Sequence, residues 1–588
     1  MKIKILIKAN YVFARELVRK HKLLFFFQFI IILLNSVNTV LSSYLPKVFL
    51  DMVQVRARLD WAIVWVLIYT IFFLLRNVIN NSASIYLKYC YNRAKSKTKY
   101  HTDLHYQQLN DAFFDNPENL NICKRALSYA GIGGENFFNY IFSFLSNIIG
   151  IISLILVLTP FKWWISCFLT LMMLYRVVLE YKMSKKEFEF KKERTLTDRQ
   201  IGYFSRLTNE RGTLYDIRIY NLFDYFYNKF YGYFEYNTKC YVNHEKKMLF
   251  YKVLLQIPFV IQNLILYSYI GYQLYAGNVT SGDFTLFFAA VSNFNILLGN
   301  IKNSFTQLAP MCLEAQNYED FMSVEEIYLL KNNNVVINEI QKIEFDKVSF
   351  KYPGKDFFIL RDVSFKVYAH EKIQIVGVNG AGKTTIIKLL LGFYEPTQGE
   401  IKINDISLKH INLNSYWARI GTIFQQYNIY SMSAIENVVF DMSENKENFV
   451  KSVFSKLDLL QRFEKEPMGL KTELSKTFSE RGTNLSGGEK QKISIARALC
   501  NYGEMLILDE PSSALDIISE DKFFNIINNS DKMVLCVYHK LKNSFKPDKI
   551  LVLDNNKCLG YGDHSTLLNT CEKYRNLYNA QENKRSKE

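Results

Sequence analysis

A glycine-rich segment that ends in a lysine and two threonines is the part of the sequence best suited to binding phosphate. Glycines allow close backbone approach and point N–H groups at phosphate oxygens. A short apolar strand is expected over 374–376 and a helix over 386–391, so the helix N-terminus faces the same anion. This order of strand, loop and helix indicates a nucleotide phosphate loop. The segment consists of Gly377, Val378, Asn379, Gly380, Ala381, Gly382, Lys383, Thr384 and Thr385.

Two carboxylates that end an apolar strand provide the metal and proton chemistry such a loop needs. Residues 505–508 predict a buried strand, followed by Asp509 and Glu510. Asp509, together with the Thr384 hydroxyl, is expected to hold the Mg²⁺ shell, while Lys383 reaches the phosphates as a point charge. Glu510 is the candidate general base for an attacking water. A solvated turn is the alternative interpretation, and the phosphate loop upstream makes it the weaker one.

A second candidate anion site comes shortly before that strand. Ser486, Gly487, Gly488 and Glu489 lead into a helix expected over 492–499. A Ser-Gly-Gly sequence at a helix start offers backbone N–H groups and the positive helix end to an anion. One nucleotide already has its own phosphate loop. The second site therefore suggests contact with a phosphate held by a different molecule.

Long apolar runs fill the sequence before about residue 305, whereas the rest reads as a soluble α/β domain. A chain of 588 residues exceeds what one core usually holds, so at least two domains are expected. Each run has about the 20 apolar residues that a bilayer requires. We therefore expect an all-α six-helix transmembrane domain followed by an α/β P-loop ATPase domain. The expected spans are about 23–44, 61–82, 137–158, 162–182, 249–274 and 283–304.

Charge placement predicts the orientation of these spans. The formal net charge is +16, which also fits a nucleic-acid-binding protein. The long segments 83–136 and 183–248 are basic, whereas the short loops near 159–162 and 274–282 carry one charge between them. Positive residues collect on cytoplasmic loops, so both termini are expected in the cytoplasm and nucleic-acid binding is disfavoured.

The expected domain boundaries follow from these patterns. Basic and apolar residues at the start predict an interfacial helix, whose apolar face consists of Ile3, Ile5, Leu6, Tyr11, Val12 and Leu17. The ranges are 1–22 for this helix, 23–310 for the transmembrane domain, 311–340 for a linker, 341–575 for the nucleotide-binding domain and 576–588 for a polar tail.

Polar side chains interrupt the apolar spans. Arg176 and Glu180 are four residues apart and are expected to pair. Individually such residues fit helix–helix contacts, whereas the set favours a polar substrate cavity. The set is Asn35, Asn38, Arg76, Asn77, Asn80, Arg176, Glu180, Gln256, Gln262 and Asn293. The nine cysteines form no CxxC pair, which disfavours a zinc or redox motif.

The segment Leu485-Ser486-Gly487-Gly488-Glu489 resembles the signature of the ATP-binding cassette (ABC) transporters, and the resemblance extends over most of the chain. It implies that Tyr352 stacks on adenine, that Gln425 senses Mg²⁺ and the membrane domain, and that His539 contacts the γ-phosphate. Glu480-Arg481-Gly482 resembles the segment that touches coupling helices, and Ser513-Ala514-Leu515-Asp516 resembles the D-loop. Lys540 follows the histidine where Arg is common.

The six-helix half resembles the exporter type of this family. Phe113-Phe114-Asp115-Asn116-Pro117 resembles the first coupling region and the segment 216–221 the second. The resemblance implies that each ATP is held between the phosphate loop of one subunit and the signature of another. A homodimer is favoured because Glu510 is present, and a heterodimer stays open. We also expect no leader-cleaving peptidase domain in this chain.

The resemblance implies an ATP-hydrolysing exporter in the cell inner (plasma) membrane, with ATP and Mg²⁺ as cofactors and its ATPase domain in the cytoplasm. Its implied partners are a second half-transporter, membrane lipid and the transported substrate, with no nucleic acid. A peptide or peptide-like substrate is favoured. A lipid or hydrophobic drug, or a role as an ATP-gated channel or sensor partner, is the alternative.

Overall fold

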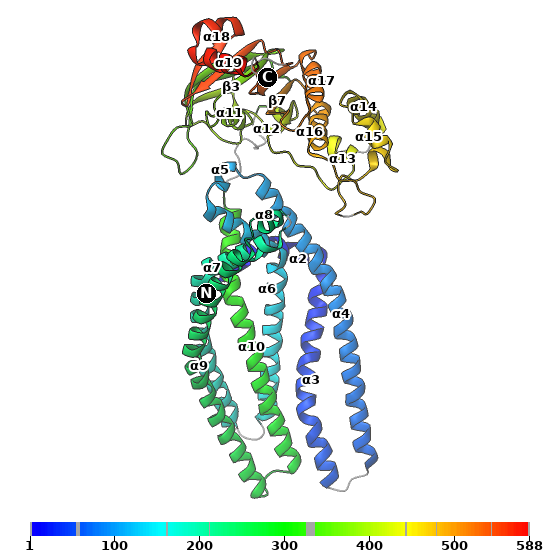
Figure 1. Cartoon of the computed structure of the whole chain (residues 1–588). Coiled ribbons are helices and arrows are strands. Elements are labelled where there is room, and N and C mark those ends of the chain that lie inside the picture. Colours follow the sequence, from blue (N-terminus) through cyan, green and yellow to red (C-terminus); the bar gives the residue numbers. More distant parts are fainter. Residues whose placement is uncertain are drawn as a thin grey trace. The chain divides into compact units, whose positions relative to one another are not determined.

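The computed structural model describes residues 3–54, 59–159, 163–210, 212–324, 335–440, 444–477, 479–501, 503–541 and 544–585. The chain forms two compact units (Figure 1). The first comprises residues 1–106 and 121–323, and the second comprises residues 107–120 and 324–588. The short segment 107–120 therefore leaves the helical unit and belongs to the ATPase unit.

Long helices build the first unit. They are α3 (Lys22–Gln54), α4 (Leu59–Gln107), α6 (Pro117–Leu158), α7 (Trp163–Asn209), α9 (Phe223–Tyr275) and α10 (Ser281–Met322). Five of the described helices are long and apolar enough to cross a membrane, namely α3, α4, α6, α9 and α10. The sixth predicted span, 162–182, falls on α7, whose apolar stretch Trp163–Met172 is shorter and runs over residues not all described. The prediction of a helical membrane domain before an α/β domain is confirmed.

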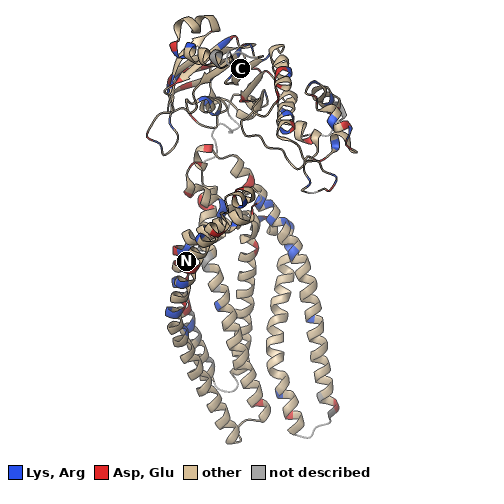
Figure 2. Ribbon diagram, viewed as in Figure 1, with Lys and Arg blue, Asp and Glu red and all other residues tan. Residues whose placement is uncertain are grey.

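Several helices are much longer than a bilayer needs. Helices α4, α7 and α9 contain 49, 47 and 53 residues, against the roughly 20 that span the hydrocarbon core. Figure 2 shows Lys and Arg gathered towards one end of this unit, whereas the remaining lengths of the helices carry few charges. The basic segments of the sequence are thus largely helical extensions, with the short helix α8 (Leu214–Ile219) between α7 and α9.

The N-terminus forms two short helices, α1 (Ile3–Ala9) and α2 (Tyr11–Lys20). Leu6 and Leu17 are buried as the sequence predicts, whereas Tyr11 is 59% exposed and Phe13 takes its place in the core. The helix break at Asn10 explains the change of face, because the Asn10 side chain turns inward and donates to the Tyr129 hydroxyl at 2.8 Å.

Two helices run beyond the expected boundaries. Helix α10 continues to Met322, into the expected linker 311–340, part of which (325–334) lies outside the described residues. Helix α19 (Glu572–Arg585) covers most of the expected polar tail 576–588. Its first turn is anchored by the fully buried Tyr574.

The second unit contains two sheets. The smaller is antiparallel, in the order β2 (Leu360–Tyr368), β1 (Lys342–Phe350), β4 (Gln398–Ile403) and β5 (Ile406–Ser407). The larger has the order β10 (Lys557–Gly562), β9 (Lys549–Asp554), β3 (Lys372–Gly377), β8 (Met533–Val537), β7 (Met505–Asp509) and β6 (Ile420–Ile423). All its pairings are parallel except β10 with β9. The carboxyl ends of β3, β8 and β7 therefore meet at one edge.

Helices surround these sheets. Helix α11 (Lys383–Leu390) follows β3, α16 (Gly487–Asn501) precedes β7, and α17 (Ile517–Asn528) connects β7 to β8. The remaining helices are α5 (Asp111–Phe114), α12 (Leu413–Trp417), α13 (Ala434–Val439), α14 (Glu444–Lys456), α15 (Leu460–Glu464) and α18 (His564–Thr570), with 3-10 turns at Leu408–His410 and Gly469–Lys471.

Candidate functional site

The phosphate loop follows β3 and passes into α11 at Lys383. Gly382 has φ +95°, and a Cβ built there would lie 2.7 Å from the Leu360 side chain, so glycine is required. The Lys383 Nζ donates to the carbonyl oxygens of Gly377 at 2.9 Å and Val378 at 3.0 Å. Burial lowers the pKa of Lys383. The lysine thus lies folded over the loop, on the side where phosphate oxygens would replace the two carbonyls.

Asp509 ends β7 beside this loop. Its side chain is buried, and burial raises the pKa of its carboxyl group, while a hydrogen bond from Thr384 acts in the opposite direction. A buried carboxylate next to a threonine hydroxyl fits an Mg²⁺ shell, because Mg²⁺ takes one or two protein oxygens and completes its shell with water and phosphate. The described residues contain no group of three or more His, Cys, Asp or Glu suited to a metal.

Glu510 contacts the two other predicted catalytic residues, His539 and Gln425. Its Oε1 lies 2.7 Å from His539 Nε2, and its Oε2 accepts a hydrogen bond from Gln425 Nε2 at 3.2 Å. The backbone of Glu510 has φ +51°, a left-handed conformation that is strained for a residue with a side chain. Its N–H donates to the Val537 carbonyl at 3.0 Å, which holds that conformation. The three side chains therefore converge at the carboxyl ends of β7 and β8.

Tyr352 lies close to the phosphate-loop helix. Its hydroxyl is 3.2 Å from the Thr385 Oγ1, and Lys388 Nζ is 5.7 Å from its ring centroid. The Phe350 and Tyr394 rings meet it edge-on, at 5.0 and 5.2 Å between centroids. These contacts fix the ring beside the loop, and its predicted stacking on adenine stays a prediction.

The signature residues begin α16, where Glu489 has a structural role. The Glu489 Oε2 accepts the Ser486 backbone N–H at 2.8 Å, and the Ser486 Oγ accepts the Glu489 N–H at 3.3 Å. This reciprocal pair caps the helix start. Arg462 Nε also donates to Glu489, at 3.2 Å. The Glu489 carboxylate is thus occupied within its own chain, whereas Gly487 has open space where a Cβ would be.

The signature and the phosphate loop lie on different parts of the larger sheet. Helix α16 contacts the edge strand β6, and β7 and β8 lie between β6 and β3. Strands are spaced about 4.8 Å apart, so three spacings amount to roughly 14 Å. This arrangement agrees with a signature that contacts the nucleotide of another molecule.

The segment 107–120 supplies a contact that sequence reasoning did not find. Helix α5 overlaps the start of the predicted first coupling region, 113–117, and Ala112 packs on the core of the ATPase unit. Asp115 Oδ2 accepts a hydrogen bond from the Tyr394 hydroxyl at 3.0 Å. Burial raises the pKa of Asp111, and the charge of Lys388 opposes that rise. The predicted second region, 216–221, overlaps the end of α8, where Ile219 is 75% exposed.

Most of the predicted polar side chains of the spans bridge helices. Arg76 donates to Asn35 at 2.8 Å, and Asn293 donates to Ser43 at 2.9 Å. The expected Arg176–Glu180 pair does not form between these two described side chains. Lys302 of α10 lies 3.8 Å from Glu180 instead, and the Arg176 guanidinium lies over the Phe259 ring. Each of these two side chains therefore interacts with a partner on another helix instead of with the other.

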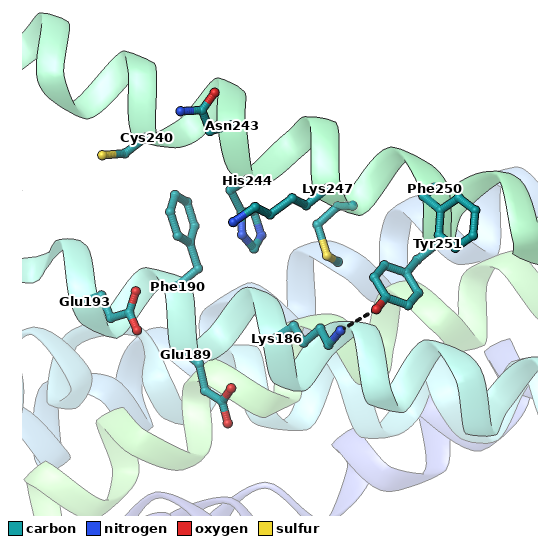
Figure 3. A pocket seen from close by; sticks show the side chains of 11 residues that line it. Lys186, Glu189, Phe190, Glu193, Cys240, Asn243, His244, Lys247, Phe250 and Tyr251 are labelled. Carbon is teal, nitrogen blue, oxygen red and sulfur yellow. Dashed lines mark hydrogen bonds between the residues drawn. The ribbon is translucent and has the colours of Figure 1, made fainter.

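A cleft of about 700 Å³ opens between α7 and α9 (Figure 3). The Phe190 ring stacks on His244 with 3.9 Å between centroids, and Lys186 Nζ donates to the Tyr251 hydroxyl at 2.8 Å. The His244 Nε2 is buried and has no hydrogen-bond partner among the described residues. The lining combines aromatic rings with both signs of charge: Lys186, Glu189, Phe190, Glu193, Cys240, Asn243, His244, Lys247, Met248, Phe250 and Tyr251.

Comparison with known proteins decides what kind of molecule carries this site. The family model described as "ABC transporter" matches residues 360–513, from β2 to the loop after β7. The chain is an ABC half-transporter. The subtilin transport ATP-binding protein SpaT of Bacillus subtilis is 28% identical over 475 residues, which cover 79% of this chain and 76% of that protein.

Two further relatives and one solved structure extend the comparison. The nisin transport ATP-binding protein NisT of Lactococcus lactis is 25% identical and covers 75% of this half-transporter and 74% of its own length. The pediocin PA-1 transport/processing protein PedD of Pediococcus acidilactici is 37% identical over 270 residues, 44% of this chain and 37% of that protein. The fold matches a bacterial Atm1-family ABC exporter structure with a TM-score of 0.79 at 19% identity, over 97% of this chain and 99% of that one.

These findings fix the general activity. The half-transporter is a membrane protein whose ATP-binding domain is an ATPase coupled to transport, and its fold is that of an ABC exporter. The roles of the individual site residues stay predictions.

Proposed function

We propose that this half-transporter exports a peptide from the cytoplasm by ATP-driven alternating access. The observation that carries the proposal is the match to the subtilin and nisin transport proteins, which covers 79% and 75% of the chain. A match of that length extends beyond the ATPase domain into the helices that would form the substrate path. The substrates that these relatives are named for are bacteriocin peptides.

The site geometry supports specific roles in ATP hydrolysis. We assign Lys383 to the β- and γ-phosphates and Tyr352 to the adenine ring. Thr384, Asp509 and Gln425 would hold Mg²⁺, which supplies neutralising charge on the phosphates when bound. Glu510 would accept the proton of the attacking water, because its carboxylate already lies 2.7 Å from His539, a partner able to orient it.

We further propose a homodimer in the cell inner (plasma) membrane, with the ATPase unit in the cytoplasm. Each ATP would be held by the phosphate loop of one copy and by Ser486, Gly487 and Gly488 of the other. Glu510 and His539 are both present in this chain, so two identical copies would supply these residues to both ATP sites. A heterodimer with a second, different half-transporter is the alternative assembly.

The cleft between α7 and α9 is a candidate contact for the exported peptide. A peptide presents backbone carbonyls, N–H groups and side chains of mixed character. The cleft offers aromatic rings, Lys247, Glu193 and the unpartnered His244 Nε2 in one place. A lipid or hydrophobic drug would instead favour a mainly apolar lining.

Inverted membrane vesicles containing the full chain test the proposal. Peptides of the bacteriocin class, labelled and supplied outside the vesicles with ATP and Mg²⁺, should accumulate inside and stimulate ATP turnover. Lys247→Met should reduce the peptide-stimulated turnover and leave basal turnover unchanged, with Lys252→Met on the same helix as the control. Accumulation of lipid or drug analogues alone would replace the peptide assignment, and flux without ATP hydrolysis would indicate a channel.

A further inference from the structure

A buried glutamate near the site makes contacts that the proposed roles do not explain. Glu520 lies in the first turn of α17, and its side chain is 5% exposed. Its Oε1 accepts hydrogen bonds from the Ser512 hydroxyl at 2.6 Å and the Tyr538 hydroxyl at 2.5 Å. Its Oε2 forms an ion pair with Lys540 Nζ at 2.7 Å. One carboxylate therefore has three donors from two different loops.

The donors lie next to the proposed catalytic residues. Ser512 is two positions after Glu510, and Tyr538 and Lys540 are the two immediate neighbours of His539. Glu520 thus connects the loop after β7 with the loop after β8. Those two loops carry the side chains of Glu510 and His539, whose reacting atoms are 2.7 Å apart.

The position of Glu520 is itself fixed. Asp516 caps α17 by accepting the Ser519 N–H at 2.9 Å, and its other oxygen accepts the Ser519 hydroxyl at 2.8 Å. The capped helix start holds Glu520 one turn away from Asp516. Charge-assisted hydrogen bonds are short and directional. A carboxylate whose own position is fixed can therefore determine the distance between the two loops that donate to it.

The contacts of Glu520 favour its charged carboxylate. Burial raises its pKa, but the hydrogen bonds from Lys540, Ser512 and Tyr538 outweigh that effect, so the pKa lies below its ordinary value. The ion pair with Lys540 compensates the buried charge. Removing one partner would leave the other uncompensated.

We propose that Glu520 is a positioning residue for ATP hydrolysis, which holds the Glu510 and His539 loops in register through Ser512, Tyr538 and Lys540. A carboxylate that only stabilised the domain could take its donors from anywhere in the core. Here all three lie within two residues of the groups that would handle the water proton and the γ-phosphate. This inference rests on the proposed roles of Glu510 and His539.

The test compares turnover with nucleotide binding in the full-length protein in lipid. Glu520→Gln keeps the shape of the side chain and removes its charge. We expect kcat for ATP to fall about tenfold or more, with the KM and the affinity for ATP changed less than about twofold. Lys522→Met is the matched control, because Lys522 is on the same helix and pairs with the exposed Asp458 at 2.6 Å. Its kcat should equal that of the wild type.

Rescue and coupling separate positioning from mere stabilisation. Lys540→Met should lower kcat as Glu520→Gln does. Lys540→Arg should keep kcat near the wild-type value, because the arginine keeps the positive charge. In a His539→Ala background, Glu520→Gln should cause no further loss, because the two changes remove the same arrangement. A structural role would instead lower the melting temperature and kcat additively in both backgrounds.

Three results would overturn the inference: a kcat for Glu520→Gln equal to that of Lys522→Met, an equal loss of ATP affinity and turnover, or additive losses with His539→Ala. Failure of the proposed function has a different result. If Glu510→Gln leaves turnover intact, the assignment of the hydrolytic residues is wrong, whatever Glu520 does. If Glu510→Gln abolishes turnover and Glu520→Gln does not affect it, only the present inference fails.

Discussion

The Oε1 of Glu510 and the Nε2 of His539 lie 2.7 Å apart, although 29 residues separate them in the sequence. They meet because β7 and β8 are adjacent parallel strands, so the residues that follow them emerge at the same edge of the sheet. The left-handed backbone of Glu510, φ +51°, turns its carboxylate towards the histidine. The fold itself thus brings the candidate base and its partner together.

Glu510→Gln should abolish turnover and preserve ATP binding. The amide cannot accept the proton of water, so we expect at least about a hundredfold loss of kcat and an ATP-bound closed dimer. Crosslinking of the two ATPase units and a radiolabelled ATP-binding assay measure this. Asp458→Asn, an exposed acid whose partner is Lys522, is the control. Unimpaired turnover would remove Glu510 from the catalytic role.

Gly382→Ala should remove ATP binding. The residue has φ +95°, and an added Cβ would lie 2.7 Å from Leu360 and 3.2 Å from the Ile359 carbonyl oxygen. The loop must shift, and its N–H groups then no longer converge on phosphate. Gly354→Ala is a matched control, because Gly354 has φ +72° with nothing within 4 Å. It should cost about 1 kcal/mol of stability without changing ATP affinity in equilibrium binding. Equal affinities for both variants would contradict the assigned phosphate loop.

Tyr394→Phe should weaken the docking of the segment 107–120 on the ATPase unit. It removes the hydrogen bond to Asp115, which is worth about 1.5–3 kcal/mol for a charged acceptor. We expect basal turnover to persist and stimulation by transported peptide to fall. Tyr416→Phe is the control, because its fully buried hydroxyl donates to the Leu390 carbonyl and not to that segment. Equal stimulation in both variants would show that the Asp115 contact is dispensable.

The stability contributed by Glu520 should depend on pH. Its pKa is lowered in the folded protein, whereas an unfolded glutamate has a pKa of about 4.3. The stabilisation is therefore fully present above that unfolded value and is lost as pH falls through the lower folded value. Hydrogen-exchange protection of α17 and β8 should be higher in the wild type than in Glu520→Gln at neutral pH, and the difference should shrink in acid. A difference that grows with acidity would contradict the ion pair with Lys540.

Gln581→Ala should lower turnover by a few-fold, the effect of about 1 kcal/mol for neutral hydrogen bonds. The Gln581 side chain donates to the His539 carbonyl at 2.6 Å and accepts the Leu541 N–H at 2.8 Å. It therefore holds the histidine loop from α19. Gln341→Ala, at an exposed side chain that contacts Glu339, provides the comparison in steady-state kinetics. Identical kcat values would show that the α19 contact does not affect His539.

The local motifs could be predicted from sequence because each depends on neighbouring residues. The glycine spacing before Lys383 predicts the phosphate loop, and the apolar strand before Asp509 predicts a carboxylate at a strand end. Glu520, Tyr394 and Gln581 gave no such signal, because their partners lie in other elements of the fold, 8 to 279 residues away. Tyr394 meets Asp115 across 279 positions, and only the docking of the segment 107–120 brings them together. The Arg176–Glu180 prediction failed for the same reason, since Lys302 on another helix lies beside Glu180.

The N-terminal helix shows how a single polar residue changes a pattern. Periodicity places Tyr11 on the apolar face, but the break at Asn10 turns Phe13 inward instead. Periodicity assumes one continuous helix. A buried asparagine that bonds to Tyr129 ends that continuity, and the sequence gives no sign of that distant partner.

The central claim is that ATP hydrolysis at these residues drives transport, and Mg²⁺-dependent ATP turnover tests it most directly. The purified full-length protein in lipid, alone or with its partner half, should hydrolyse ATP in the presence of Mg²⁺. Turnover should stop when the metal is chelated and in Glu510→Gln. Absence of Mg²⁺-dependent turnover in every such preparation would contradict the claim.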